Sequence, residues 1–256
     1  TETDGIYLFD ASSKPITIFA PLKTLLLKDK LPLGSLLENA SIIFSHDYTQ
    51  AIIEVPIENN SNSYLISMGS ENQEVFDVTS SKTTLIQAWE NERNKEIVKV
   101  LETFPSNIQK VASASFDIVS FSPDQTKVLY KSLTNANIPV LINPPLIASN
   151  QSKEERNLNT GSLYVYDKKE DKNYKISSGD LNINNVIWYS DSKRLVYKES
   201  DRISISSYDA ANKQIVYSGP IDSKFYAVNS DGKLLILANL NPKTNKLPDL
   251  YLVGIR

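Results

Sequence analysis

Four ten-residue segments of the chain share one pattern of apolar and polar positions. Each opens on a large apolar residue, places an aspartate fourth and ends in an apolar run. They are FSHDYTQAII (residues 44–53), FSPDQTKVLY (121–130), WYSDSKRLVY (188–197) and VNSDGKLLIL (228–237). A further apolar residue lies two positions before each segment, which is the period of a strand with one buried face. The pattern therefore predicts four β-hairpins, each with a polar turn around its aspartate.

The aspartates of these turns are interpreted as structural. They are Asp47, Asp124, Asp191 and Asp231. Aspartate and serine side chains bond to their own backbone in tight turns, and each hairpin needs its own turn residue. The alternative interpretation is a set of paired carboxylates for glycoside hydrolysis. The fixed place of the aspartate in every hairpin favours the turn.

A second pattern, in which a charged turn separates two strands, follows the hairpins. It occupies residues 161–176 and 202–217, recurs at 5–19, is looser at 62–78, and is half present at 249–255. Two hairpins in series make a four-stranded antiparallel blade, the unit of a β-propeller. We therefore predict an all-β fold: a single β-propeller domain over residues 1–256, or an excised arc of one. An N-terminal strand that completed the last blade would give about five blades.

The spacing of the aspartates predicts two insertions. They are separated by 77, 67 and 40 residues, whereas a blade takes about 40–45 residues. The first surplus is residues 81–115, where apolar residues at helical spacing predict an amphipathic helix that Pro105 ends. A short helical turn that carries Ile108 and Val111 is expected after this proline. The second surplus is residues 134–161, a long loop between two strands, in which Pro144 and Pro145 exclude a central strand.

These insertions are the candidate contact surfaces, because long connections in compact domains are uncommon and often functional. In the helix, the apolar stripe that includes Trp89 either packs inside the protein or fills a partner's groove. In the loop, the charged residues either recognise a ligand or form a solvated face. The candidate partner-binding residues are Trp89, Arg93, Leu146, Ile147, Glu154, Glu155 and Arg156.

The composition of the chain argues against several kinds of functional site, as its charge, cysteine and histidine content show. The 256 residues carry a net charge of −3 with no basic stripe, which is atypical of a nucleic-acid-binding protein. Without cysteine and with His46 as the single histidine, the usual zinc sites and a Ser-His-Asp triad are not expected. We interpret His46 as a turn residue near the surface. The run DKKEDKN (167–173) lacks EF-hand spacing and is interpreted as a solvated turn. No apolar run reaches the ~20 residues of a membrane span, so no direct membrane insertion is predicted.

The segment FSPDQTKVLY resembles the repeat unit of TolB-like, WD40-like (PD40-type) β-propellers. The runs AWENERNKE and IPVLINPPLIASNQSKEERNLNTGSLYVYDKKEDKNY are similar to the propeller region of bacterial proteins that carry an N-terminal PEGA domain. The resemblance covers residues 5–256. It implies an exported, membrane-anchored bacterial protein with an extracytoplasmic location, and it implies no catalytic residues.

The expected function is accordingly a non-catalytic interaction or scaffold module. It would bind a protein or a cell-envelope component, without a cofactor, metal or nucleic acid. The alternative is an enzyme, or the accessory propeller of one, acting on peptides or glycans at the central channel.

Overall fold

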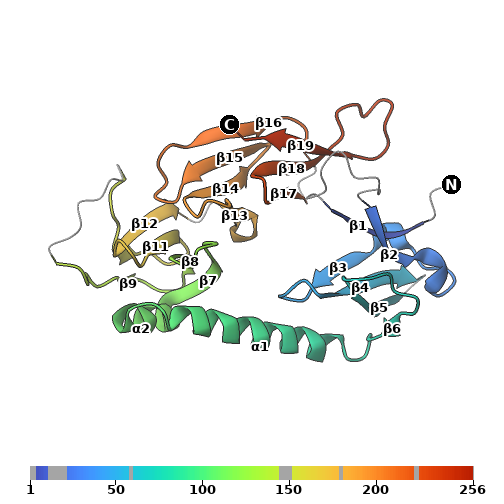
Figure 1. Ribbon diagram of the computed structural model, residues 1–256, viewed down its shortest axis with the longest axis horizontal. Coiled ribbons are helices and arrows are strands. Elements are labelled where there is room, and N and C mark those ends of the chain that lie inside the picture. The colour runs from blue at the N-terminus through green and yellow to red at the C-terminus, as the bar shows by residue number, and fades with distance from the viewer. Residues whose placement is uncertain are drawn as a thin grey trace. The chain divides into compact units, whose positions relative to one another are not determined.

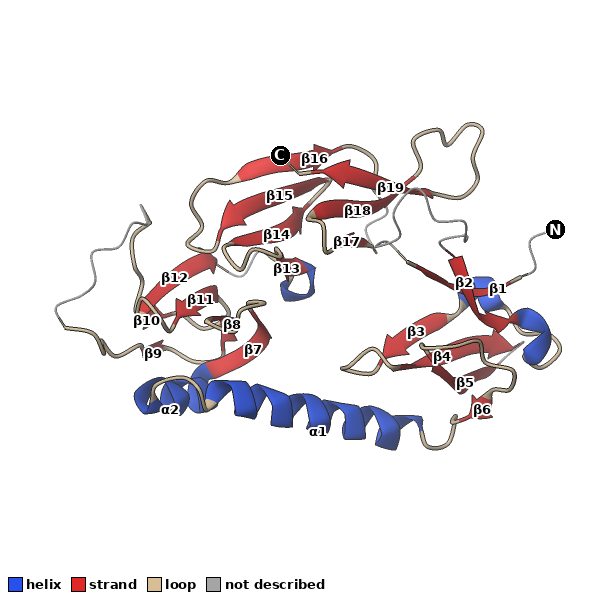
Figure 2. Ribbon diagram, viewed as in Figure 1, coloured by secondary structure: helices blue, strands red, loops and turns tan. Residues whose placement is uncertain are grey.

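The computed structural model describes residues 4–10, 22–57, 60–143, 152–178, 181–221 and 225–255. Within these residues, every strand belongs to an antiparallel sheet, three of the sheets have four strands, and two α-helices accompany them (Figure 2). The all-β class and the four-stranded antiparallel sheets are therefore confirmed. The chain divides into two compact units, residues 1–98 and residues 99–256.

The first unit contains two sheets that share a core. Strands β1 (Gly5–Phe9) and β2 (Leu22–Leu27) form one antiparallel pair. Strands β3 (Ser41–Phe44), β4 (Gln50–Ile57), β5 (Asn60–Ser67) and β6 (Phe76–Asp77) form the other sheet in sequence order. The short 3-10 helices η1 (Lys28–Lys30) and η2 (Leu37–Asn39) connect the two sheets. Alternate residues Ala51, Ile53 and Val55 of β4 pack with Leu26 of β2, as expected for one buried face of a strand.

Residues 81–115 hold the two helices, α1 (Lys82–Leu101) and α2 (Ser106–Ser115). The first helix was expected from its apolar spacing, and it ends before Pro105 as predicted. Pro105 stands at the N-cap of α2, where its missing N–H removes no helical hydrogen bond. Only a short helical turn was expected after Pro105, but α2 is ten residues long. Its length follows from packing, because Ile108 and Ala112 are buried in a core.

The second unit contains three larger sheets (Figure 1). The first comprises β7 (Phe116–Phe121), β8 (Lys127–Ser132), β11 (Leu163–Asp167) and β12 (Lys172–Ser177), in the order β12-β11-β8-β7. After η3 (Ile183–Asn185), the second comprises β13 (Val186–Trp188), β14 (Arg194–Glu199), β15 (Arg202–Ser207) and β16 (Gln214–Ser218). The third comprises β17 (Tyr226–Val228), β18 (Lys233–Ala238) and β19 (Asp249–Gly254). The four predicted aspartate hairpins are β3–β4, β7–β8, β13–β14 and β17–β18, and all four are confirmed.

The sheets of the second unit are stacked face to face. Successive side chains of a strand point to opposite faces, and β8 shows both faces buried. Leu129 packs in a core with residues of β14, while Val128 and Tyr130 pack in a different core with α2. On the far side of the β13–β16 sheet, Val196 packs with Leu234 of β18. Helix α2 therefore covers the outer face of the first of three stacked sheets.

The N-terminal strand pair departs from the expectation. Its first strand is β1, whereas the second predicted strand falls in residues 11–21, which lie outside the described residues. In the structure β1 pairs with β2, a strand that the repeat pattern did not reveal. Within the described residues the last sheet has three strands, β17 to β19, so a fourth strand from the N-terminus is not observed there.

The insertion at residues 134–161 contains a short ladder that was not expected. Strands β9 (Ala136–Asn137) and β10 (Asn157–Leu158) pair at its base, because the two ends of the insertion run antiparallel where they leave the sheet. Pro144 and Pro145, like Leu146 and Ile147, lie outside the described residues.

Candidate functional site

The four aspartate turns share a backbone conformation. The residue after each aspartate has a positive φ: 57° at Tyr48, 55° at Gln125, 60° at Ser192 and 75° at Gly232. Three of these are non-glycine residues, for which this left-handed conformation is uncommon. Side-chain hydrogen bonds must therefore hold the turns in place.

Asp124 shows how this is done. Its Oδ1 accepts hydrogen bonds from Ser122 Oγ at 2.6 Å, from the Thr126 N–H at 3.1 Å and from Thr126 Oγ1 at 2.9 Å. Partial burial raises the pKa of Asp124, but the bonds from Ser122 and Thr126 outweigh it and lower the pKa to about 2. Asp47 accepts the same three bonds at the same lengths, and they lower its pKa to about 2, with Ser45 as the largest cause.

The other two hairpins use variants of this turn. Asp191 Oδ1 accepts the Lys193 N–H at 2.9 Å, and its Oδ2 lies 2.8 Å from Arg194 Nε. In the fourth hairpin it is Asn229 that accepts the turn N–H, from Lys233 at 2.7 Å. Asn229 was not singled out from the sequence, although it stands where the second hairpin has Ser122 and asparagine is a common turn residue.

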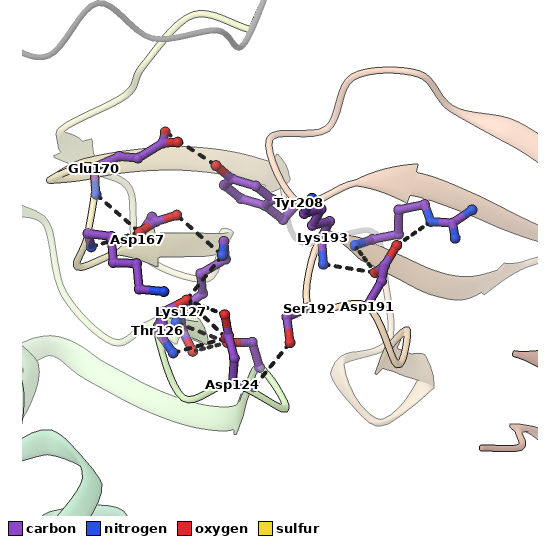
Figure 3. Close-up of polar contacts among 12 residues, drawn as sticks. Asp124, Thr126, Lys127, Asp167, Glu170, Asp191, Ser192, Lys193 and Tyr208 are labelled. Carbon is purple, nitrogen blue, oxygen red and sulfur yellow. Dashed lines mark hydrogen bonds and ion pairs between the residues drawn. The ribbon is translucent and has the colours of Figure 1, made fainter. Parts of the chain in front are cut away.

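Turns of neighbouring sheets in the second unit contact one another. The Asp124 N–H donates to Ser192 Oγ at 3.0 Å, which joins the β7–β8 turn to the β13–β14 turn (Figure 3). Tyr189 Oη donates to the Gly232 carbonyl at 2.9 Å, which joins the β13–β14 turn to the β17–β18 turn. The repeated hairpins thus place their turns in one row along an edge of the stacked sheets.

A pocket lies along this row, between the first and second sheets of the unit. Its volume is about 460 Å³, within the usual 300–1,000 Å³ range of ligand pockets. It is lined by Lys127, Asp167, Lys169, Glu170, Lys193, Ser207, Tyr208, Asp209, Ala211 and Asn212. The lining is largely charged, and it comes from turns of both sheets.

A buried ion pair belongs to this lining. Lys127 Nζ lies 3.4 Å from Asp167 Oδ2, and the two side chains are only 8% and 3% exposed. Asp167 Oδ1 also accepts the backbone N–H groups of Lys169 and Glu170, so both of its oxygens are bonded. The Tyr208 ring lies 4.8 Å from the ammonium, at a distance that suits a cation–π contact. A buried pair needs such additional bonds, because desolvation offsets much of its attraction.

Four further charged residues complete the pocket. Lys169 and Glu170 are adjacent in the β11–β12 turn, whereas Lys193 and Asp209 come from turns of the second sheet. Tyr208 Oη donates to Glu170 Oε2 at 3.3 Å, across the two sheets (Figure 3). Each wall therefore presents both signs of charge.

The interpretation of residues 167–173 as a solvated turn is wrong. Asp167 and Asp171 are 2% and 3% exposed. Both carboxylates face inward because they accept backbone N–H groups, Asp167 from its own turn and Asp171 from Leu141 and Ile142 of the insertion. The donors to Asp171 lie 30 and 29 residues away along the chain, so they leave no signal in the local sequence.

The charged residues predicted in the insertion lie at its base. Arg156 Nε is 2.5 Å from Glu154 Oε1, and Arg156 Nη2 is 3.4 Å from Asp171 Oδ2. The Glu155 N–H donates to the Asn173 carbonyl at 2.8 Å. Burial raises the pKa of Asp171, but the N–H bonds from the insertion and the charge of Arg156 hold it below the usual value. These residues fasten the insertion to the β11–β12 turn, and their role toward a partner stays a prediction.

The predicted residues of α1 differ in exposure. Trp89 is 8% exposed, so its side chain packs within the protein, while Arg93 is exposed. His46 lies in the β3–β4 turn as predicted, and its side chain is largely covered, with 13% exposed. The reason is α1: His46 Nε2 lies 3.5 Å from Glu96 Oε1 and Nδ1 lies 3.9 Å from Glu92 Oε2.

The residues that the structure describes contain neither a cluster of metal ligands nor a helix suited to cross a membrane. In the described part of the chain, no three histidine, cysteine or acidic side chains gather in a way that could hold a metal ion. Neither described α-helix combines the length and the apolar character that a membrane crossing requires.

The chain was then compared with known proteins. No protein-family model matches it, and no curated protein matches it in sequence. Similar solved structures include TolB from Agrobacterium tumefaciens, 11% identical with a TM-score of 0.30 over 91% of this chain and 62% of that one. TolB from Acinetobacter baumannii is 11% identical with a TM-score of 0.24, over 84% and 43%. Pyrococcus horikoshii acylaminoacyl peptidase is 11% identical with a TM-score of 0.26, over 84% and 30%.

The chain thus spans less than two thirds of the length of each of these three proteins. TM-scores this low carry no argument about function.

Proposed function

We propose that the chain is a non-catalytic interaction module, built as a β-propeller or an arc of one, that binds a peptide segment of a protein or cell-envelope partner. One observation carries the proposal: the charged pocket between the turns of two stacked sheets. Its volume lies within the usual range of ligand pockets, and charged side chains from two sheets converge on it.

The repeated aspartate hairpins support the assignment of a β-propeller. Successive sheets each begin with the same aspartate hairpin, and within the second unit they stack face to face. Radially repeated four-stranded sheets are the architecture of propellers. The resemblance of residues 121–130 to TolB-like repeats points the same way. The similarity of the insertions to PEGA-associated propellers is the reason to propose an extracytoplasmic, membrane-anchored parent protein.

The chemistry of the pocket favours binding over catalysis. A nucleophilic lysine must be neutral, whereas Lys127 lies beside the carboxylate of Asp167. A general base must reach a substrate proton, whereas both oxygens of Asp167 are engaged. The remaining candidate is an enzyme, or its accessory propeller, acting on peptides or glycans at a central channel.

Binding and cleavage can be separated in one experiment. The isotope-labelled chain is titrated with pooled synthetic tetrapeptides, acetylated and amidated at their ends, and with cell-wall glycan fragments, while mass spectrometry follows the integrity of each probe. We expect amide shifts in the turns around Lys169, Lys193 and Asp209, with every probe intact. Cleaved probes would support the enzyme instead, and shifts confined to other surfaces would contradict the proposed site.

A further inference from the structure

We infer that the pocket between the β11–β12 turn and the turns of the β13–β16 sheet binds a short zwitterionic peptide, one that carries both a free ammonium group and a free carboxylate. This inference rests on the proposed binding function and adds the chemical class of the ligand.

The charges of the pocket determine the chemical class of its ligand. Of its six charged side chains, Lys127 and Asp167 neutralise each other below the surface. Four remain: Lys169, Lys193, Glu170 and Asp209. Among the residues that the structure describes, no ion pair joins either of these lysines to either of these acids. A ligand of a single charge would be attracted by one pair and repelled by the other, whereas a ligand with both charges complements the site.

The acidic side chains are held in place before any ligand arrives. Glu170 accepts the hydroxyl of Tyr208, and its backbone N–H is bonded to Asp167. Asp209 is 4% exposed, and its Oδ1 accepts the Ala211 N–H at 3.1 Å. Lys169 and Lys193 are exposed and can turn toward a carboxylate. Preorganised groups lose little freedom on binding, so a fixed acidic side suits the compact ammonium group.

The size and walls of the pocket suit a short peptide rather than a single ion. The volume of about 460 Å³ lies in the lower half of the range for ligand pockets. The Tyr208 ring and Ala211 offer apolar contact between the charged groups, as in sites where a few polar groups fix the orientation of a ligand.

The test compares four probes that differ in charge: trialanine, N-acetyl-trialanine, trialanine amide and inorganic phosphate. Each is titrated into the full chain, and dissociation constants are taken from amide shifts. We expect trialanine to bind in the pocket and each blocked form to bind about fivefold or more weakly, since each loses one charge interaction. Phosphate should bind more weakly than trialanine because of the acids.

Charge-removing variants assign the ends of the ligand. Lys193→Gln should weaken binding of trialanine but not of its amide, which has no carboxylate. Glu170→Gln should weaken binding of trialanine but not of the acetylated form, which has no ammonium group. Lys243→Gln, at an exposed site outside the pocket, is the matched control and should change neither affinity.

The outcomes distinguish this inference from the proposed function. If all three peptides shift the pocket amides with equal affinity, the ligand class is wrong and the interaction module stands. If phosphate binds more tightly than trialanine, the ligand class is an anion and not a zwitterion. If none of the probes shifts the pocket amides, while the pooled tetrapeptides do, the zwitterion is again excluded. Failure of the pooled probes as well would overturn both.

Discussion

At the residue scale, one serine, one aspartate and one threonine are enough to build a turn. Ser122, Asp124 and Thr126 form a closed set of hydrogen bonds that the first hairpin repeats at equal lengths. The bonds require an ionised carboxylate, which is why the pKa of Asp124 falls to about 2. Asp124 therefore stabilises the turn and does not resemble a catalytic acid.

This lowered pKa predicts a dependence of stability on pH. The folded-state pKa values of Asp47 and Asp124 are about 2, and the unfolded value is about 3.9. A depressed pKa gives a stabilisation that is fully present above the unfolded value and is lost as the pH falls from about 4 toward 2. Urea midpoints measured from pH 6 to pH 2 should show this loss. The double variant Asp47→Asn/Asp124→Asn should show a smaller loss, and an equal loss would exclude these two groups as its cause.

Gly232 is predicted to be intolerant of a side chain for two reasons. Its φ is +75°, and a Cβ there would lie 2.0 Å from Tyr189 Oη. Gly161 has a similar φ of +83° but nothing within 4 Å of its Cβ position, so it isolates the backbone effect. Gly161→Ala should cost about 1–2 kcal/mol, and Gly232→Ala should cost clearly more in the free energy of unfolding. Equal costs in urea unfolding would show that the turn shifts freely away from Tyr189.

At the element scale, the insertion of residues 134–161 is fastened to the sheet that it leaves. The carboxylate of Asp171 accepts N–H groups from Leu141 and Ile142, and the guanidinium of Arg156 lies against it. A long connection without such contacts unfolds locally at a small cost in free energy. The described ends of the insertion, including Glu154 to Arg156, are therefore held against the β11–β12 turn.

Removing Arg156 tests this anchor. Arg156→Ala leaves Asp171 3% exposed without its cation, and breaking a buried pair in this way costs about 3 kcal/mol. Unfolding of the variant in urea should show a loss of that order. Arg202→Ala, at an exposed arginine of β15, is the control and should stay within about 0.5 kcal/mol of the parent. A similar small change for Arg156→Ala would mean that the insertion is not held by this contact.

At the scale of the whole molecule, each unit has its own cores. The cores between the stacked sheets and under α2 draw only on residues after Lys99, and the core of β2, β4 and β5 draws only on residues before it. Helix α2 covers the outer face of the β7–β12 sheet, where a stack would otherwise expose Tyr130 and Tyr166. A buried outer face is what an independently stable stack requires.

A chain of residues 99–256 is therefore expected to fold by itself. It keeps three stacked sheets, α2 and the pocket, so it should give a cooperative thermal transition with a near-ultraviolet circular dichroism signal. The full chain should then show this transition together with a second one for the first unit. A fragment that keeps its strand content but melts without cooperativity would show that its cores depend on residues 1–98.

The sequence by itself determined the hairpins, their aspartate turns, the four-stranded antiparallel sheets and the positions of the two insertions. These features depend on the alternation of neighbouring side chains and on bonds within a few residues, which local sequence encodes. The pairing of β1 with β2, the length of α2 and the covering of His46 were decided by packing partners distant along the chain.

The candidate site belongs entirely to the tertiary structure. Lys127, Asp167 and Tyr208 come from three separate segments and meet only because two sheets stack with their turns along one edge. The sequence alone predicted a solvated turn at residues 167–173 and assigned no role to Lys127 or Tyr208. Stacking of the sheets buries Lys127 beside Asp167 and brings the other charged residues around the pocket. A charge that is removed from water is stable only beside a partner, and here the tertiary structure supplies that partner.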